Sequence, residues 1–224
     1  MPRVATRPAA GGGKWVEVEP ERLEGWLARF GERHGAARMS ATPESVTLEA
    51  ADGALAEVVV PYPPLLVKES GAYAGLIEHA LRSRRIGVLL VRLGGHAVGV
   101  VEGDRLVASK TGSRQVHGRS AAGGWSQQRF ARRREGQVRV ALQAAADAAV
   151  AVLLPAAPTL DGLVLGGDRR ATSEVLDDPR LAPLRPLRTG RHLDVPEPRQ
   201  RVLENAVRDL RLVQVRVVEP SADG

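Results

Sequence analysis

The spacing of apolar positions near the N-terminus predicts a small unit of three strands and one helix. Leu23, Leu27 and Phe30 recur at helical spacing, and the stretches before and after them alternate between apolar and polar residues, as strands do. The predicted elements are a strand over 14–19, a helix over 20–31, and strands over 45–49 and 56–61. We therefore expect a βαββ unit over residues 14–62, preceded by a disordered tail over residues 1–13 that ends in three glycines.

The apolar pattern predicts a second, larger unit over residues 72–219, after a proline-containing linker over residues 63–71. Its predicted elements are a helix over 72–84, strands over 86–92, 97–102 and 106–109, a long helix from 126 to about 152, a strand over 160–165, helices over 170–177 and 197–209, and a strand over 212–218. Strands joined both by hairpins and by helical crossovers indicate an α/β fold. We expect a mixed sheet flanked by helices.

The positive charge of the chain is concentrated in one segment. The sequence has 32 Lys and Arg residues against 26 Asp and Glu, a net charge of +6, and residues 113–140 contain seven arginines against one acid. This segment holds the whole surplus, so the rest of the chain sums to zero. A neutral body with one basic segment is typical of a protein that binds a polyanion, because guanidinium groups displace counterions from phosphates. The alternative is a solvated, arginine-rich helix face.

The composition excludes several classes of chemistry. The chain has no cysteine, which excludes a thiol nucleophile, disulfides and cysteine-based zinc sites. Its five histidines show no HExxH pattern, and neither a Walker loop nor a GxSxG elbow is present. The sequence contains no run of about 18 apolar residues, so we expect a cytoplasmic protein without a membrane partner and without a cofactor.

Four carboxylates beside the predicted strands offer an alternative based on metal chemistry. Glu102, Asp104, Asp161 and Asp168 could in principle converge on two metal ions, as in nucleases. Acidic residues at such positions more often close turns or cap helices. We therefore expect turn and cap roles for them, and no metal site.

A glycine-rich loop, predicted over residues 112–128, lies at the centre of the basic segment. Gly123 and Gly124 lack a Cβ, which permits a sharp bend or a close approach to another polymer. Gln127 and Gln128 follow, and an uncharged amide is a poor base but can orient a water molecule or stabilise a developing oxyanion. A flexible loop that only caps a helix is the alternative interpretation.

The long helix is predicted to begin at Ser126. Arg129, Arg132 and Arg133 then share one helix face, at spacings of three and four residues. Such a face, together with the free N–H groups of the helix N-terminus, can bind a phosphodiester backbone. The segment therefore has the composition of a protruding loop and helix end that can place a side-chain amide at a site on a nucleic acid.

Residues 117–132 read HGRSAAGGWSQQRFAR and resemble the middle domain of the eukaryotic and archaeal class-one peptide-chain release factors. In those proteins a KHGRGGQ loop precedes a helix that contains RFAR. The resemblance extends over about residues 85–210 and includes the GLVLGG stretch of residues 162–167. The Gly-x-Ser-Gln form of residues 124–127 is more similar to the Vms-like release factors of ribosome quality control. The whole chain is most similar to the actinobacterial Vms-like peptidyl-tRNA hydrolases.

The sequence departs from the release-factor pattern in two respects. Three residues are inserted between Arg119 and Gly123, and two more separate Gly124 from Gln127. The chain also has no recognisable codon-reading domain with an Asn-Ile-Lys-Ser motif. Rescue of a stalled large subunit therefore fits this sequence better than codon-directed termination.

The resemblance implies a ribonuclease-H-like α/β layout and the release of nascent peptide from peptidyl-tRNA. Carried over residue by residue, Gln127 matches the glutamine of the family's loop, and Gln128 is its nearest competitor. Gly123 and Gly124 take the glycine positions of that loop. For Trp125 there are two interpretations, stacking on a nucleobase or packing against the base of the loop.

The resemblance also implies partners and contacts. The partners are the large ribosomal subunit, its ribosomal RNA and peptidyl-tRNA. The residues implied to contact RNA are His117, Arg119, Arg129, Arg132 and Arg133. Two other functions remain open, an endonuclease that cuts the tRNA near its 3′ end and a non-catalytic factor that binds ribosomes or RNA.

Overall fold

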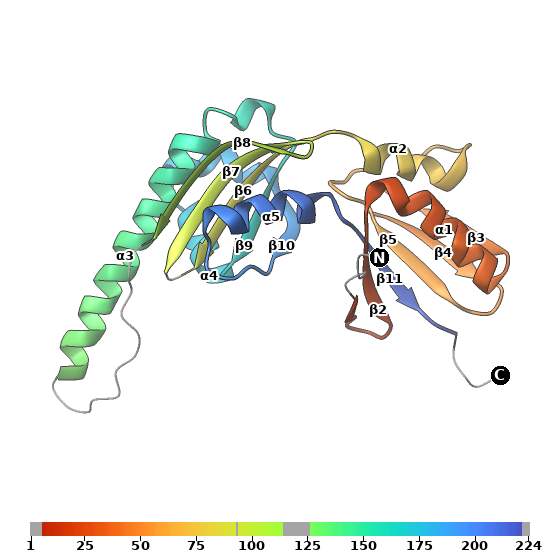
Figure 1. Ribbon diagram of the computed structural model, residues 1–224, viewed down its shortest axis with the longest axis horizontal. Coiled ribbons are helices and arrows are strands. Elements are labelled where there is room, and N and C mark those ends of the chain that lie inside the picture. Colours follow the sequence, from red (N-terminus) through yellow and green to blue (C-terminus); the bar gives the residue numbers. More distant parts are fainter. Residues whose placement is uncertain (1–5, 93, 114–125, 221–224) are drawn as a thin grey trace. The chain divides into compact units, whose positions relative to one another are not determined.

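The computed structural model divides the chain into two units (Figure 1). The structure describes residues 6–92, 94–113 and 126–220, and the side chains of residues 126–134 lie outside this description. Unit 1 consists of Met1–Arg82 and Leu210–Gly224, and unit 2 consists of Ser83–Asp209. The chain therefore leaves unit 1, forms unit 2, and then returns to unit 1.

Unit 1 is built on a six-stranded antiparallel sheet in the order β1-β2-β11-β5-β4-β3. Its elements are β1 (Thr6–Pro8), β2 (Lys14–Val18), α1 (Pro20–His34), β3 (Ala37–Ala41), β4 (Ser45–Ala50), β5 (Leu55–Val59), η1 (Ala72–Gly75), α2 (Leu76–Leu81) and β11 (Val213–Val218). Alternate residues of the central strands are buried, and α1 covers them with Leu23, Leu27 and Phe30. The helical spacing in the sequence therefore marks the face of α1 that forms the core.

The two ends of unit 1 differ from the sequence prediction. The prediction places the strand over 212–218 in the larger unit, whereas β11 pairs with β2 and β5 in the sheet of unit 1. Val213, Val215 and Val217 complete the apolar layer of this sheet, which explains why the chain returns. Residues 6–8, predicted within a disordered tail, pair with β2 as strand β1.

The boundary between the units also lies further along the chain than the predicted linker over residues 63–71. Helix α2 is predicted to open the larger unit, but Leu76 and Ala80 contribute to the core of unit 1 instead. The division falls after Arg82. The predicted βαββ unit is thus one part of a larger sheet that also contains β1, β3 and β11.

Unit 2 is built on a five-stranded mixed sheet in the order β10-β9-β6-β7-β8. Its elements are β6 (Arg85–Arg92), β7 (Gly95–Glu102), β8 (Arg105–Ser113), α3 (Ser126–Leu153), η2 (Ala157–Thr159), β9 (Gly162–Gly167), α4 (Arg169–Leu176), η3 (Pro179–Leu187), β10 (Arg188–Leu193) and α5 (Gln200–Arg211), whose last two residues belong to unit 1. Strands β6, β9 and β10 run parallel, and β7 pairs antiparallel with both β6 and β8.

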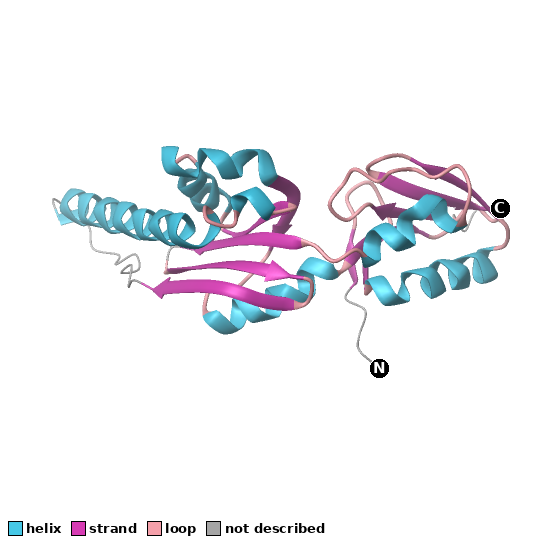
Figure 2. Cartoon of the chain, turned by 90° about the horizontal axis from the view of Figure 1, so that it is seen from above, coloured by secondary structure: helices cyan, strands magenta, loops and turns pink. Residues whose placement is uncertain are grey.

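Helices cover both faces of this sheet (Figure 2). On one face, α3, α4 and η3 pack against Leu89, Val98 and Leu165 in one apolar core. On the other face lies α5, where a Cβ built at Gly99 would come within 3.0 Å of Leu203. The prediction of an α/β fold with a mixed sheet flanked by helices is therefore confirmed.

One stretch of the described residues, Glu135–Leu153, is long and apolar enough to cross a membrane by length and composition alone. The stretch lies within α3. It supplies Leu142, Ala145, Ala146, Ala148, Ala149 and Leu153 to the core of unit 2. Packing against the sheet therefore accounts for its apolar composition.

Candidate nucleic-acid interface

The predicted site residues lie between the end of β8 and the first turns of α3. Five of them lie outside the described residues, namely His117, Arg119, Gly123, Gly124 and Trp125. The helix begins at Ser126, as predicted, so Gln127 and Gln128 belong to the first turn of α3. Arg129, Arg132 and Arg133 follow in the same uninterrupted helix, at the spacing that the sequence prediction requires.

The N-terminal half of α3 extends beyond the edge of the sheet (Figure 1). Leu142 is the first buried residue of the helix among those whose side chains are described. Between Ser126 and Leu142 the helix rises by about 24 Å, at 1.5 Å per residue. Residues 135–140 are exposed or half-buried, and Val140 is 48% exposed. Ser126 and the two glutamines therefore lie about four helical turns before Leu142, the first fully buried residue of α3 whose side chain is described.

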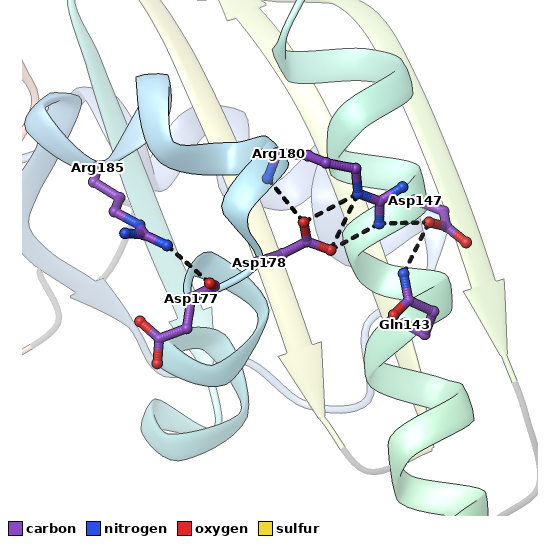
Figure 3. Close-up of polar contacts among 6 residues, drawn as sticks. All are labelled: Gln143, Asp147, Asp177, Asp178, Arg180 and Arg185. Atoms are coloured by element: carbon purple, nitrogen blue, oxygen red, sulfur yellow. Dashed lines mark hydrogen bonds and ion pairs between the residues drawn. The ribbon is translucent and has the colours of Figure 1, made fainter.

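The C-terminal half of α3 is held against the sheet by small apolar side chains and by a polar cluster. Asp147 of α3 accepts a hydrogen bond from Nη2 of Arg180 at 2.8 Å and one from Nε2 of Gln143 at 3.1 Å (Figure 3). The same guanidinium binds Asp178 at 2.7 Å, which joins α3 to the segment after α4. Because these groups are partly exposed, the cluster adds modestly to the apolar packing.

The guanidinium of Arg180 keeps both carboxylates of the cluster charged. Its hydrogen bonds lower the pKa of Asp178 to about 2, and they also lower the pKa of Asp147. A second arginine, Arg185, donates a hydrogen bond to the carbonyl oxygen of Asp177 at the end of α4 (Figure 3) and another to the carbonyl oxygen of Leu176. The cluster therefore fixes the segment that follows α4 onto the helix that carries the predicted site.

A sharp turn joins β9 to α4 at the carboxyl edge of the sheet. Gly167 has a φ of +88°, and a Cβ built there would lie 2.3 Å from the carbonyl oxygen of Val91. Asp168 follows as the N-cap of α4, and its Oδ1 accepts a hydrogen bond from the backbone N–H of Ala171 at 2.9 Å. The prediction that Asp168 caps a helix is confirmed.

A buried histidine lies on the strands from which the predicted loop departs. His96 of β7 pairs with Gly112 of β8, one residue before the end of that strand. A Cβ at Gly112 would lie 2.5 Å from the imidazole ring, so the ring occupies the space that a side chain there would need. Burial lowers the pKa of His96, and Lys110 lowers it further, which keeps the ring neutral at neutral pH. The sequence gives no signal for this contact, because the two residues become neighbours only through strand pairing.

The carboxylates considered for metal binding lie at two different edges of the sheet. Asp161 accepts a hydrogen bond from the backbone N–H of Arg85 at 2.7 Å, near the β7–β8 turn that carries Glu102 and Asp104. Asp168 lies at the opposite edge. Within the described part of the chain, no group of three or more His, Asp or Glu residues is arranged to hold a metal ion.

A protein-family model matches residues 84–216 of the chain. The matching family is the Actinobacteria/chloroflexi VLRF1 release factor family. The chain belongs to this family. The matched range contains all the predicted site residues, all of α3 and nearly all of unit 2, whereas the strands of unit 1 that precede residue 84 lie outside it.

Solved structures with similarity to the chain include three proteins of low sequence identity. An archaeal protein is 17% identical, with a TM-score of 0.41, and the match covers 71% of this chain and 48% of that one. The archaeal translation termination factor aRF1 is 16% identical, with a TM-score of 0.44, and the match covers 88% of this chain and 63% of that one. The Vms1 mitochondrial localization core is 12% identical, with a TM-score of 0.43 and coverage of 76% and 75%. The chain thus spans less than two thirds of the first two proteins, and no curated protein matches it.

Proposed function

We propose that the chain is a peptidyl-tRNA hydrolase that releases the nascent peptide from stalled ribosomal complexes. Membership in a release-factor family supports a ribosome-associated release function. The observation that carries the finer proposal is the Gly-Gly-Trp-Ser-Gln-Gln run of residues 123–128, which ends in the first turn of a helix that extends away from its core. The partners would be the large ribosomal subunit, ribosomal RNA and peptidyl-tRNA, in the cytoplasm and without a membrane.

The proposed chemistry is hydrolysis of the ester bond between the peptide and the tRNA. The side-chain amide of Gln127 orients the attacking water molecule or stabilises the oxyanion that develops on the ester carbonyl. Gln128 is the alternative residue for this role. Gly123 and Gly124 allow the backbone to approach RNA closely, with Trp125 and Ser126 between them and the glutamine.

The proposed RNA contacts come from the basic residues on both sides of the glycines. These are His117, Arg119, Arg129, Arg132 and Arg133. A guanidinium group can bind a phosphate through two parallel hydrogen bonds, so several arginines in sequence suit a ribosomal RNA surface. The length of α3 before its first buried residue, about 24 Å along the helix axis, supports this proposal, because a site deep within RNA requires an element that extends beyond the body of the unit.

The proposal is tested with large ribosomal subunits that carry a labelled nascent chain on tRNA. The parent protein is expected to free the peptide. Replacement of a positioned hydrogen-bonding group in an active site costs about 10²- to 10³-fold in rate, so Gln127→Ala or the double variant with Gln128→Ala should lose release to that degree. Gln137→Ala is the matched control, since this glutamine lies in the same helix outside the proposed site.

Mapping the 3′ end of the released tRNA distinguishes hydrolysis from the alternatives. An intact CCA end supports ester hydrolysis, and a shortened end identifies an endonuclease. Binding to the subunits without any release of peptide by the parent identifies a non-catalytic factor. If Gln127→Ala, Gln128→Ala and the double variant all release peptide as fast as the parent, the catalytic role of the glutamines is wrong.

A further inference from the structure

The surplus of positive charge belongs to unit 2, and it is larger than the net charge of the chain. Unit 2 contains 21 Lys and Arg residues against 13 Asp and Glu, whereas unit 1 contains 11 against 13. Unit 2 therefore has a formal charge of +8 and unit 1 of −2. Because residues 113–140 account for a surplus of six, the rest of unit 2 has a net surplus of two positive charges.

The carboxyl edge of the sheet in unit 2 is the edge at which the predicted loop begins. Strands β6, β9 and β10 run parallel and end there. Strand β8 ends at the same edge, because β7 pairs antiparallel with both β6 and β8. The turn between β9 and α4 lies at this edge and carries Arg169 and Arg170 at the start of α4. Both arginines are exposed.

Three carboxylates lie near these two arginines, and among the described residues none of them forms an ion pair with either arginine. Asp168 caps α4 through the N–H of Ala171, and Asp194 at the end of β10 lies 3.5 Å from Nη2 of Arg92. Glu174 lies one turn further along α4. Across the residues that the structure describes, no ion pair involves Arg169 or Arg170.

The start of α4 lies near the place where α3 leaves the core. Ala171, two residues after Arg169, belongs to the same buried cluster as Leu142, and Val138 of α3 packs against that cluster. Helices α3 and α4 are in contact on this face of the sheet. The two arginines are therefore on the side of unit 2 from which the basic half of α3 extends.

We propose that Arg169 and Arg170 form a second contact with the phosphate backbone of RNA, beside the contact made by the basic segment. This proposal rests on the proposed function, which supplies RNA as the partner. The carboxylate of Asp168 occupies the N-cap of α4 and repels a phosphate there, so the guanidinium groups rather than the helix N-terminus bind the phosphates. RNA fits this surface better than an acidic protein does, because its regularly spaced phosphates can engage the basic segment and the two arginines at once.

The test compares two double variants that remove the same number of charges from opposite edges of unit 2. R169Q/R170Q removes the proposed contact, and R105Q/R188Q removes two exposed arginines from the other ends of β8 and β10. Binding to large ribosomal subunits that carry peptidyl-tRNA is measured by sedimentation over a series of salt concentrations. A third variant, R169K/R170K, keeps both charges and controls for loss of folding at this turn.

R169Q/R170Q is expected to bind about tenfold more weakly at physiological salt, and the slope of log K against log salt should decrease in magnitude by about 1.4 to 1.8 for two phosphates. R105Q/R188Q should bind as the parent does, and R169K/R170K should keep the parent's slope.

The inference is overturned if R169Q/R170Q has the affinity and salt slope of the parent, or if R105Q/R188Q weakens binding equally. It is also overturned if the two arginines change binding to polyglutamate but not to a labelled tRNA, since the surface then fits an acidic protein. Failure of the proposed function has a different signature. In that case the parent releases no peptide, while R169Q/R170Q still weakens its binding to the subunits.

Discussion

The turn that carries Arg169 and Arg170 depends on Gly167, and the substitution Gly167→Ala tests this dependence. The added methyl group would lie 2.3 Å from the carbonyl oxygen and 3.1 Å from the carbonyl carbon of Val91. Both atoms belong to the backbone of β6, which is bonded to β7 on one side and to β9 on the other. The backbone of a central strand cannot move aside as a flexible side chain could.

The expected cost has two parts. The φ of +88° at Gly167 lies in the left-handed region, where a side chain costs about 1–2 kcal/mol per residue. Relief of the overlap with β6 adds about 1–3 kcal/mol, the usual range for an overpacked core. We therefore expect Gly167→Ala to lower the free energy of unfolding by about 2–5 kcal/mol.

The measurement is urea unfolding at neutral pH, followed by far-ultraviolet circular dichroism. Gly190→Ala in β10 is the matched control, because a Cβ built there meets no atom within 4 Å, and its effect should stay within about 0.5 kcal/mol. With a slope of about 2 kcal/mol per molar urea, the middle of the usual range, the expected loss lowers the midpoint by roughly 1–2.5 M. If Gly167→Ala unfolds at the midpoint of Gly190→Ala, the turn does not require glycine and the reasoning is refuted.

Two further substitutions test the surroundings of the predicted loop. Burial lowers the pKa of His96 below 6.5, so the unfolded chain binds more protons than the folded chain as the pH falls through this value. The parent should therefore lose stability between pH 7.5 and pH 5.5, and His96→Gln should lose less. Urea midpoints at the two pH values measure both losses. Gly136→Ala should raise the helical content of α3, with a gain of up to about 1 kcal/mol, because no atom lies within 4 Å of the position; unchanged ellipticity near 222 nm would contradict this expectation.

The sequence predicts the elements of unit 2 well because each carries a clear local signal. The start of the long helix at Ser126 follows from the end of a glycine-rich stretch and the onset of helix-forming residues. The hairpins of β6, β7 and β8 follow from apolar runs separated by glycines. The strand β10 over Arg188–Leu193 was not predicted, since RTGRHL lacks both apolar alternation and β-branched residues beyond Thr189.

The organisation of unit 1 could not be predicted, because it depends on pairings between distant parts of the chain. β11 alternates as a strand in the sequence, but alternation does not identify the sheet that the strand joins. The same limit applies to Trp15, an apolar residue of the strand predicted over 14–19. Its neighbours Val16 and Val18 face the core, while Trp15 is half-buried, with the guanidinium of Arg7 5.8 Å from its ring.

The start of α4 in unit 2 shows why the distribution of charge along a sequence differs from its distribution on the folded surface. In the sequence, Arg169 and Arg170 follow Asp168, so the run reads as nearly balanced. In the fold, Asp168 caps the helix and the two guanidinium groups remain exposed. The contact between His96 and Gly112 likewise arises only when β7 pairs with β8. Sequence reasoning therefore finds the basic segment, and the fold is needed to find the charges beside it.

The separation of charge between the two units constrains how the protein would approach the RNA partner proposed above. A neutral body with one basic segment would be attracted through that segment alone. A unit of charge +8 joined to one of charge −2 is instead attracted to RNA through the whole of unit 2, while unit 1 is weakly repelled. Long-range steering of this kind weakens steeply with salt. The rate of association with the ribosomal subunit should therefore fall with salt more steeply than the seven arginines of the basic segment alone would produce.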